Sequence, residues 1–561
     1  MSFSNQKDSI WSKVWTLFLN DKKPIFKMII CLMLTGAATF IQPLIVRKIT
    51  DQGMISKDLE CIFIFSILLF ITFLILRIIG VLQIKVFSDI HNTMTFTLYK
   101  DSFVKLMHLP IDYFYNKSSA EIVSNISTDI NGISSIMDRV ASLSIFSLLQ
   151  IISGIIGLAI LDWKLTLLIL ILLPLKYLAI NKISKIKKSF VKDLIENNSK
   201  FSAWFGDNIN GIKELKLWNM LDIKNIELKK LQENILDMYK KNMILDQYEI
   251  FIETILDALV NSGLYILSGY LIIRGNFTVG GAFAFISYSA YITAPISSII
   301  NIRYYMAHIK PSAKRLSEFF ELSEESLKHT ADLEENISKN SNMPLIEFDN
   351  VSFSFDNSKI LLKNVSFKIY KNQRIAFIGC NGSGKTTIFN LLLGFYQPNE
   401  GEIRMNGIPL ADIGLVKLRE HFSVVSQDPY LFHTTVKENI DMLNNYSNEE
   451  INSICEVCGI NKFIDKLPLG YEQTIGLMGA KLSGGEKQKL IIARALLKKS
   501  DILLLDEATS AYDINSIEKL NLSFDNQFID KTIINITHQC ENFKGIHQIL
   551  KLENGNIFLV N

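Results

Sequence analysis

Six long apolar stretches constrain this chain more than any other feature of its sequence. A helix needs about 20 apolar residues to cross the hydrocarbon core of a bilayer. The stretches cover residues 28–46, 61–82, 141–161, 165–180, 250–273 and 282–302. All of them precede residue 305, so the sequence predicts an all-α, six-helix transmembrane domain within residues 1–320.

The links between these spans alternate in length. The links after the second and fourth spans are long, covering residues 83–140 and 181–249, and the others are short. The long links carry basic residues, among them Lys182, Lys185 and Lys187, which places these links and both chain termini in the cytoplasm. Their helical periodicity predicts that the spanning helices continue beyond the lipid as stalks.

The remainder of the chain has the character of a soluble protein. A polar linker over residues 321–343 precedes a predicted α/β domain over residues 344–561. The net charge of only +2 disfavours a nucleic-acid-binding protein. Cys455 and Cys458 have C-x-x-C spacing without the further ligands of a zinc site, so we interpret them as ordinary helix residues. Frequent Ile, Lys and Asn are typical of AT-rich bacterial genomes, and we therefore expect a bacterial inner or plasma membrane.

A glycine-rich loop carries the chemistry of the soluble domain. It lies between an apolar strand over residues 374–378 and a helical run over residues 388–393, which is the context of a phosphate-binding loop. Its candidate ATP-binding residues are Gly379, Asn381, Gly382, Ser383, Gly384, Lys385, Thr386 and Thr387. The glycines let backbone amides turn toward phosphate oxygens, while Lys385 reaches the terminal phosphates and the Thr386 hydroxyl ligates Mg²⁺. The loop predicts ATP and Mg²⁺ as ligands and a P-loop fold for the domain.

Two carboxylates end another buried apolar strand. Asp506 and Glu507 follow the run Ile502 to Leu505. In a nucleotide hydrolase the first carboxylate of such a pair holds Mg²⁺ and the second activates water. We therefore expect Asp506 to be a metal ligand and Glu507 to be catalytic.

The segment Leu482-Ser483-Gly484-Gly485-Glu486 lies between these two motifs and is followed by a basic helical stretch. It resembles the signature of ATP-binding cassettes, and the whole chain resembles a half-transporter of the ABC superfamily, exporter class. The resemblance implies an ATPase that drives transport by alternating access in a dimer. Ser483, Gly484 and Gly485 would then contact the ATP that is held by the opposite subunit.

The resemblance also implies roles for three isolated residues. Phe355 would stack on adenine, Gln427 would join Mg²⁺ and the catalytic centre to the membrane domain, and His538 would lie near the γ-phosphate. Residues 510–513 resemble the dimer-contacting loop of the family, and segments near 112–127 and 211–220 resemble its coupling loops. One chain has one cassette, so it must pair. Since Glu507 and His538 are both present, we expect a homodimer, with a heterodimer as the alternative.

Four residues depart from the family pattern. Glu486 stands where glutamine is usual, Phe355 replaces the commoner tyrosine, and Tyr512 replaces leucine. Leu477 occupies the position of an acidic residue, which casts doubt on the salt bridges that this residue makes with the coupling helices in the family.

An acidic stripe in the membrane half bears on the charge of the cargo. Asp246, Glu249, Glu253 and Asp257 are spaced three, four and four positions apart, hence on one helix face. Glu253 and Asp257 are candidate contacts for a cationic or amphipathic cargo, because a carboxylate in hydrocarbon is costly. The alternative is that the stripe belongs to a solvated stalk. Arg77 is a further candidate cavity residue, either as the ion partner of the stripe or with its side chain extended toward the cytoplasmic surface.

The sharpest interpretation is export of a small mature or modified peptide. With only the residues before Met28 preceding the first span, we expect no leader-cutting peptidase domain. A lipid or multidrug exporter is the nearest alternative, although a lipid flippase would need basic residues for the head-group phosphate. An ATP-gated channel or a regulatory membrane ATPase is the alternative from another class, and the presence of Glu507 argues against it.

Overall fold

The computed structural model describes residues 16, 22–115, 117–135, 142–325, 343–355, 360–476, 482–508, 514–537 and 544–560. The chain divides into two compact units, Met1–Ser323 and Glu324–Asn561.

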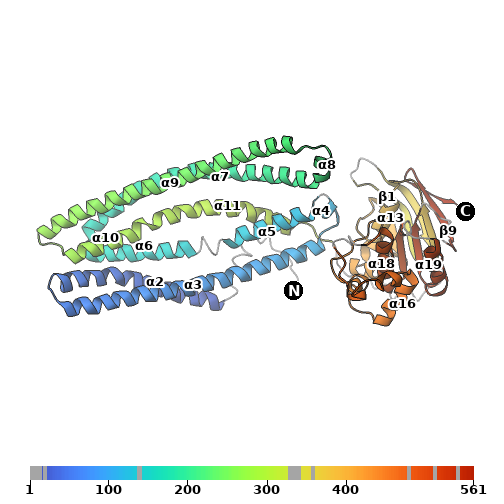
Figure 1. Cartoon of the computed structure of the whole chain (residues 1–561), viewed down its shortest axis with the longest axis horizontal. Coiled ribbons are helices and arrows are strands. Elements are labelled where there is room, and N and C mark those ends of the chain that lie inside the picture. Colours follow the sequence, from blue (N-terminus) through green and yellow to red (C-terminus); the bar gives the residue numbers. More distant parts are fainter. Residues whose placement is uncertain are drawn as a thin grey trace. The chain divides into compact units, whose positions relative to one another are not determined.

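The described residues of the first unit form helices (Figure 1). In chain order these are α2 (Lys22–Lys48), the π-helix η1 (Ile49–Met54), α3 (Leu59–His108), α4 (Asp112–Tyr115), α5 (Ser119–Ser135), α6 (Ser142–Leu161), α7 (Trp163–Asn210), α8 (Ile212–Leu217), α9 (Leu221–Ile273), α10 (Val279–Thr293) and α11 (Pro295–Glu321).

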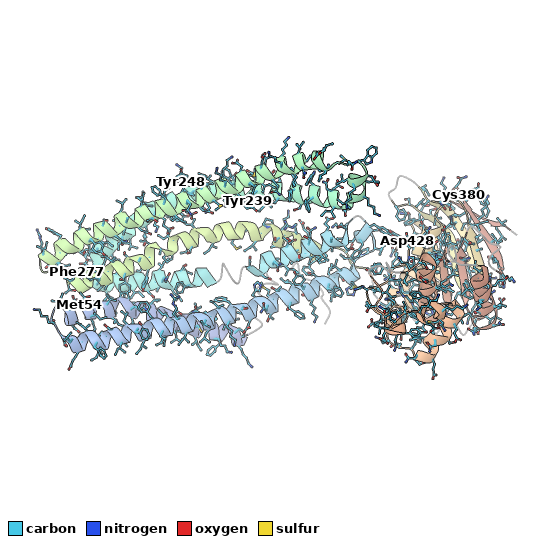
Figure 2. The ribbon with its side chains drawn as sticks, viewed as in Figure 1. Met54, Tyr239, Tyr248, Phe277, Cys380 and Asp428 are labelled. Atoms are coloured by element: carbon cyan, nitrogen blue, oxygen red, sulfur yellow. The ribbon has the colours of Figure 1, made fainter. Side chains whose placement is uncertain are left out.

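Three of these helices are far longer than a bilayer is thick. Helices α3, α7 and α9 have 50, 48 and 53 residues, and so extend for about 70–80 Å against a hydrocarbon core of about 30 Å. The turns that carry Met54 and Phe277 lie at one end of the unit (Figure 2). The short links after the first and fifth spans therefore lie at the same end of the unit.

Five helices among the described residues are long and apolar enough to cross a membrane: Lys23–Met54, Leu59–His108, Trp163–Lys187, Leu221–Ile273 and Val279–Ile300. A shorter apolar helix covers Phe146–Leu161, within the third predicted span. The predicted span over residues 282–302 corresponds to the span Val279–Ile300, within which α10 ends at Thr293 and α11 begins at Pro295. Pro295 has no backbone N–H and cannot continue the hydrogen-bond ladder.

Small residues bring α6 against α10 inside the first unit. A Cβ atom on Gly157 would lie 2.5 Å from the ring of Tyr288, so only glycine leaves space for that ring. Tyr288 is fully buried and its hydroxyl donates to the carbonyl of Phe40 on α2. Tyr288 thus brings α2, α6 and α10 together at one point.

The described residues of the second unit form two sheets. An antiparallel sheet has the order β2-β1-β4-β5, and a six-stranded sheet has the order β10-β9-β3-β8-β7-β6. In the larger sheet β9, β3, β8, β7 and β6 are parallel, and β10 is antiparallel to β9. The strand bounds are β1 (Ile346–Phe353), β2 (Leu362–Ile369), β3 (Arg374–Ile378), β4 (Glu400–Met405), β5 (Ile408–Pro409), β6 (Phe422–Val425), β7 (Ile502–Asp506), β8 (Thr532–Ile536), β9 (Gln548–Glu553) and β10 (Asn556–Val560).

Helices cover the larger sheet. They are α13 (Lys385–Leu392), α14 (Leu415–Glu420), α15 (Val436–Ile440), α16 (Asn448–Cys458), α17 (Asn461–Ile464), α18 (Gly484–Leu497) and α19 (Ile514–Asn526), with the short 3₁₀ turns η3 (Leu410–Asp412) and η4 (Gly470–Glu472). Every residue of β7 and β8 is buried, as expected for parallel strands covered on both faces.

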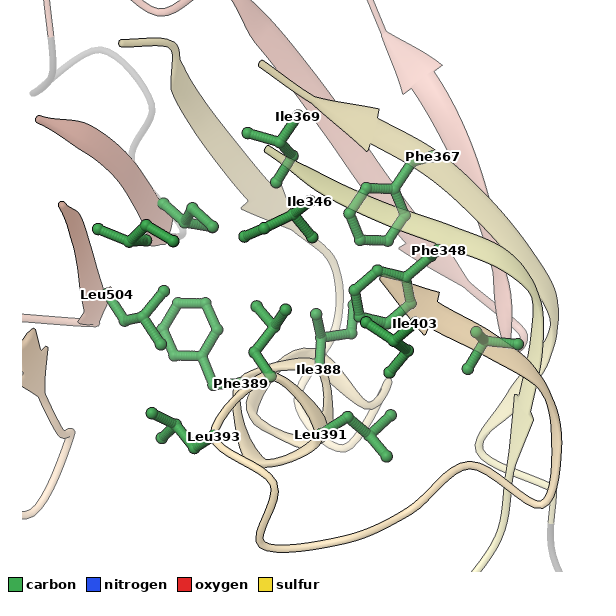
Figure 3. Packing of buried hydrophobic residues seen from close by; sticks show 14 of the residues in the cluster. Ile346, Phe348, Phe367, Ile369, Ile388, Phe389, Leu391, Leu393, Ile403 and Leu504 are labelled. Carbon is green, nitrogen blue, oxygen red and sulfur yellow. The ribbon is translucent and has the colours of Figure 1, made fainter. Parts of the chain in front are cut away.

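Alternate residues of β7 contribute to two separate hydrophobic clusters. Leu504 packs with α13, β1 and β2, whereas Leu503 and Leu505 pack with α16 and α18. Figure 3 shows Ile388, Phe389 and other side chains of α13 packed toward the strands. This packing fixes α13, whose N-terminus carries the glycine-rich loop. Cys458 lies in the second cluster beside Cys455, and burial raises the pKa of Cys455 to about 11, so these thiols are core residues.

Candidate nucleotide-binding site

The glycine-rich loop connects the end of β3 to the start of α13. Gly384 caps α13 with a φ of 103°, a left-handed conformation that glycine adopts without strain. A Cβ atom on Gly379 would lie 2.4 Å from the carbonyl oxygen of Leu552, so the loop passes too close to β9 for any side chain there. Asn381 and Gly382 are exposed in the loop, while Thr387 is buried in the first turn of α13.

Lys385 lies inside this loop. Its side chain is buried, and its Nζ donates to the carbonyls of Gly379 and Cys380 at 2.8 and 2.9 Å. The Oγ of Ser383 is buried and has no hydrogen-bond partner among the described residues. A buried cation and an unpaired hydroxyl at a helix N-terminus fit an anionic, oxygen-rich ligand such as a nucleotide phosphate.

Thr386 and Asp506 meet although 120 positions separate them in sequence. The Thr386 hydroxyl donates to the Asp506 carboxylate at 2.9 Å. Burial raises the pKa of Asp506, and the nearby charge of Glu507 raises it further, against the opposing effects of Thr386 and Lys385. A cation bound next to this buried carboxylate would lower the free-energy cost of keeping it ionised.

The donor set at this point fits Mg²⁺. This ion prefers oxygen ligands and is usually held by one or two protein groups together with substrate phosphates. Thr386 and Asp506 supply one hydroxyl and one carboxylate next to the phosphate loop. In the described part of the chain no cluster of three or more His, Cys, Asp and Glu residues could hold a metal by itself.

Glu507 lies beside Asp506 with its side chain toward Gln427. The Nε2 of Gln427 donates to the Glu507 carboxylate at 3.1 Å. Glu507 has a φ of 49°, and its N–H donates to the carbonyl of Ile536 at 3.0 Å. A left-handed glutamate costs on the order of 1 kcal/mol or more, and such strain concentrates at functional sites. The strand ends therefore present Glu507, Gln427 and Asp506 in one place.

Phe355 belongs to an aromatic group that sequence reasoning identified only in part. Its ring lies 5.1 Å from the ring of Phe353 and 5.1 Å from that of Tyr396, both edge-on. About half of Phe355 is exposed, which leaves ring surface for a flat ligand. Tyr396 was missed; its position a few residues beyond the phosphate-loop helix could have suggested it.

The signature segment forms the N-terminus of α18. Ser483 is the N-cap: its Oγ accepts from the Glu486 N–H at 3.3 Å, and the Ser483 N–H donates to the Glu486 carboxylate at 2.8 Å. This reciprocal pair is a capping box. Glu486, which departs from the family pattern, thus stabilises the helix start next to exposed Gly484, while Gly485 is half-buried.

Several predicted residues lie outside the described part of the chain. They are His538, Leu477 and the segment 510–513. Their predicted roles remain predictions.

The acidic stripe of α9 has ion partners that the sequence did not identify. Lys176 Nζ lies 2.7 Å from the Asp257 carboxylate and 3.5 Å from that of Glu253, and it also donates to the Thr293 carbonyl at 3.0 Å. Lys176 is only 4% exposed.

A second lysine of α7 repeats the arrangement three turns further along. Lys187 Nζ lies 2.6 Å from the Asp246 carboxylate and 2.5 Å from that of Glu249. Arg77, by contrast, is exposed on α3. The structure therefore corrects the suggestion that Arg77 pairs with the stripe. Lys176 and Lys187 lie on α7, which packs against α9. This packing brings the two lysines to the carboxylates of the stripe, and their positions in the sequence do not reveal it.

Comparison with known proteins is consistent with both units. Residues 25–296 match the family described as "ABC transporter transmembrane region", and residues 362–510 match the family described as "ABC transporter". An ATP-dependent lipid A-core flippase of Haemophilus influenzae (strain 86-028NP) is 30% identical over 479 residues, which is 83% of this chain and 79% of the relative.

Two further proteins resemble nearly the whole chain. The transport/processing ATP-binding protein ComA of Streptococcus pneumoniae (strain ATCC BAA-255 / R6) is 25% identical over 98% of this chain and 76% of its own length. A solved structure of a bacterial Atm1-family ABC exporter with ATP bound has a TM-score of 0.79 at 23% identity, covering 96% of this chain and 95% of that chain. The last likeness is one of fold.

Proposed function

The chain belongs to the ABC transporter family as an exporter half-transporter, and we propose that it works as a homodimer that exports a small cationic or amphipathic compound, such as a mature or modified peptide. It is an ATPase coupled to transport, and exporters of this type function as dimers. The relatives include a lipid A-core flippase and a transport/processing ATP-binding protein, so the cargo class rests on this chain's own residues.

The hydrogen bonds that gather the nucleotide residues support the ATPase roles. Thr386 and Asp506 would hold Mg²⁺, which would neutralise charge on the transferred phosphoryl group. Glu507 accepts a hydrogen bond from Gln427, and this bond orients its carboxylate for proton transfer from water. Lys385 provides the fixed positive charge of the phosphate loop.

The ionic stripe of α9 is the observation that carries the cargo proposal. Four carboxylates face two lysine ammonium groups, so these six side chains have a formal charge of −2. Asp257 and Glu253 are 30% and 24% exposed, whereas Lys176 is almost wholly covered. A cationic cargo group can therefore approach the carboxylates more readily than an anionic group can approach the lysine.

The same observation argues against a phosphorylated lipid as cargo. Recognition of a head-group phosphate needs available basic groups, and Lys176 and Lys187 are already paired with two carboxylates each. Because a lipid A-core flippase is among the relatives, the experiment below also tests a phosphorylated lipid as cargo.

ATPase stimulation in lipid nanodiscs tests the cargo class. A short lysine-rich amphipathic peptide should stimulate ATP hydrolysis by the parent, and the same peptide with glutamate in place of lysine should not. In the double variant Glu253→Gln, Asp257→Asn, the ratio of stimulated to basal rate should fall toward one. The control is Glu196→Gln, an exposed carboxylate on α7 paired with Lys200 one turn away. Equal stimulation of the double variant, or stimulation by phosphorylated lipid alone, would overturn the cargo proposal.

Direction and subunit composition need separate measurements. Inverted membrane vesicles given external ATP should accumulate the fluorescent cationic peptide, and loss of preloaded peptide would contradict export. The chain purified alone should be an active dimer by mass measurement and ATP turnover. If activity needs a second, different chain, the homodimer is refuted while the ATPase roles stand.

A further inference from the structure

The main chain leaves the helical unit at a point that is tightly held. Helix α11 ends at Glu321, and its C-cap carbonyl at Leu322 accepts a hydrogen bond from Lys105 Nζ at 2.6 Å. Lys105 comes from α3 and is only 7% exposed. The end of the last helix is thus fixed to its own unit.

The chain is held again almost at once on the cassette. The guanidinium of Arg419 on α14 donates two hydrogen bonds, of 2.9 and 3.0 Å, to the carboxylate of Glu325. The Glu325 side chain is 12% exposed. Both residues lie in the unit that begins at Glu324. Only Ser323 and Glu324 lie in sequence between the two fixed points, Leu322 and Glu325.

Arg419 also contacts the end of the phosphate-loop helix. Its Nε donates to the carbonyl of Leu393, the C-cap of α13, at 3.2 Å. Its guanidinium lies 4.9 Å from the ring centre of Phe395. One side chain therefore joins Glu325 to the helix whose other end carries Lys385 and Thr386.

The backbone at Arg419 is tied to two further nucleotide elements. Lys498, the C-cap of α18, donates to the carbonyls of Arg419 and Phe422, each at 2.7 Å. Phe422 begins β6, the strand that leads to Gln427. The ends of α13 and α18 and the start of β6 thus converge on Arg419.

We propose that the Glu325–Arg419 pair is a positioning joint that passes nucleotide-dependent movement of α13 to α11 through the main chain. Arg419 touches neither nucleotide nor cargo in this scheme; it acts through Glu325. Only two residues separate Glu325 from Leu322. The main chain between them can therefore absorb little of a displacement of Glu325, and most of it reaches Leu322. The joint rests on the ATP-driven part of the proposed function and is independent of what the cargo is.

Hydrogen exchange of the full chain in nanodiscs tests this joint. The probe is Mg²⁺ with a non-hydrolysable ATP analogue, and two peptides are followed, one from α13 (residues 385–392) and one from the end of α11 (residues 313–321). In the parent the analogue should protect the α13 peptide and change exchange in the α11 peptide. In Glu325→Gln and in Arg419→Gln, protection of α13 should persist while the α11 response falls at least threefold. The double variant should be no worse than Arg419→Gln alone, since that change already breaks the contact with Glu325.

The matched control is Arg404→Gln, which breaks another partly exposed arginine–glutamate pair of the cassette, with Glu402. It should leave the α11 response intact. An undiminished α11 response in the single variants overturns the joint, and so does loss of α13 protection in them, which would make the pair a requirement for binding or folding. Absence of α13 protection in the parent would instead refute nucleotide binding, and hence the proposed function itself.

Discussion

Replacing Asp506 by asparagine should stabilise the nucleotide-free cassette even though it removes a residue of the nucleotide site. Asp506 is 4% exposed, and its raised pKa means that the folded protein must hold an ionised carboxylate in an unfavourable environment at neutral pH. Each pKa unit of such a shift corresponds to about 1.4 kcal/mol. Asparagine removes this cost and can still accept the hydrogen bond from Thr386. We therefore expect a more stable cassette and a higher Tm, and each kcal/mol gained would raise the Tm of a domain of this size by about 2–4 °C.

The raised pKa of Asp506 also predicts how the Tm difference between variant and parent changes with pH. In the unfolded chain Asp506 has an ordinary pKa near about 3.9, whereas in the folded chain it is higher. The folded state therefore takes up a proton first as the pH falls, and the cost of the buried charge disappears between the raised and the ordinary pKa. The difference in Tm between Asp506→Asn and the parent should be largest at pH 8 and should shrink as the pH is lowered.

Thermal unfolding of the full chain in nanodiscs, with EDTA and no nucleotide, measures this difference. The control is Asp530→Asn, an exposed aspartate on the same unit, which should leave Tm within about 1 °C. With Mg²⁺ and ATP at about 100 times the Kd, the parent should gain about 2.7 kcal/mol, and the variant should gain much less. A lower Tm for Asp506→Asn in EDTA at pH 8, or a difference that does not change with pH, would refute the reasoning.

Further substitutions test other parts of the structure. Glu507→Gln should lower phosphate release by about 10²–10⁴ while nucleotide binding persists, because the amide keeps the size and polarity of the carboxylate but cannot take a proton from water; unchanged turnover would remove its catalytic role. Lys176→Met should destabilise the helical unit by about 3–5 kcal/mol in thermal unfolding, because it leaves two partly buried carboxylates without their cation. Neutralising both carboxylates in the same variant should restore Tm, and failure to do so would contradict the ion-pair explanation. Ser483→Ala should cost about 0.5–2 kcal/mol in the same assay and Glu486→Gln much less, since the amide oxygen can still accept from the Ser483 N–H; equal losses would show that charge, and not capping, matters at Glu486.

The local secondary structure around the glycine-rich loop was predicted correctly. The strand, glycine-rich loop and helix around Lys385 occur in the order that phosphate binding requires, and the structure has them as β3, the loop and α13. The apolar runs likewise predicted where helices would be, because hydrophobic length is a local property. The hydrogen bond missing at Pro295 could also have been anticipated, since proline has no backbone N–H.

Contacts between residues far apart in the chain could not be predicted in this way. The family, the two kinds of domain and the phosphate chemistry follow from short motifs and from hydrophobic patterning, and both can be read along the chain. The pairing of Lys176 with the acidic stripe, and the contacts of Arg419 with Glu325 and the end of α13, became visible only once the helices and strands were packed. A side chain's partner depends on how helices and strands pack in three dimensions, and no spacing along the chain encodes which of many lysines and arginines will face a given carboxylate.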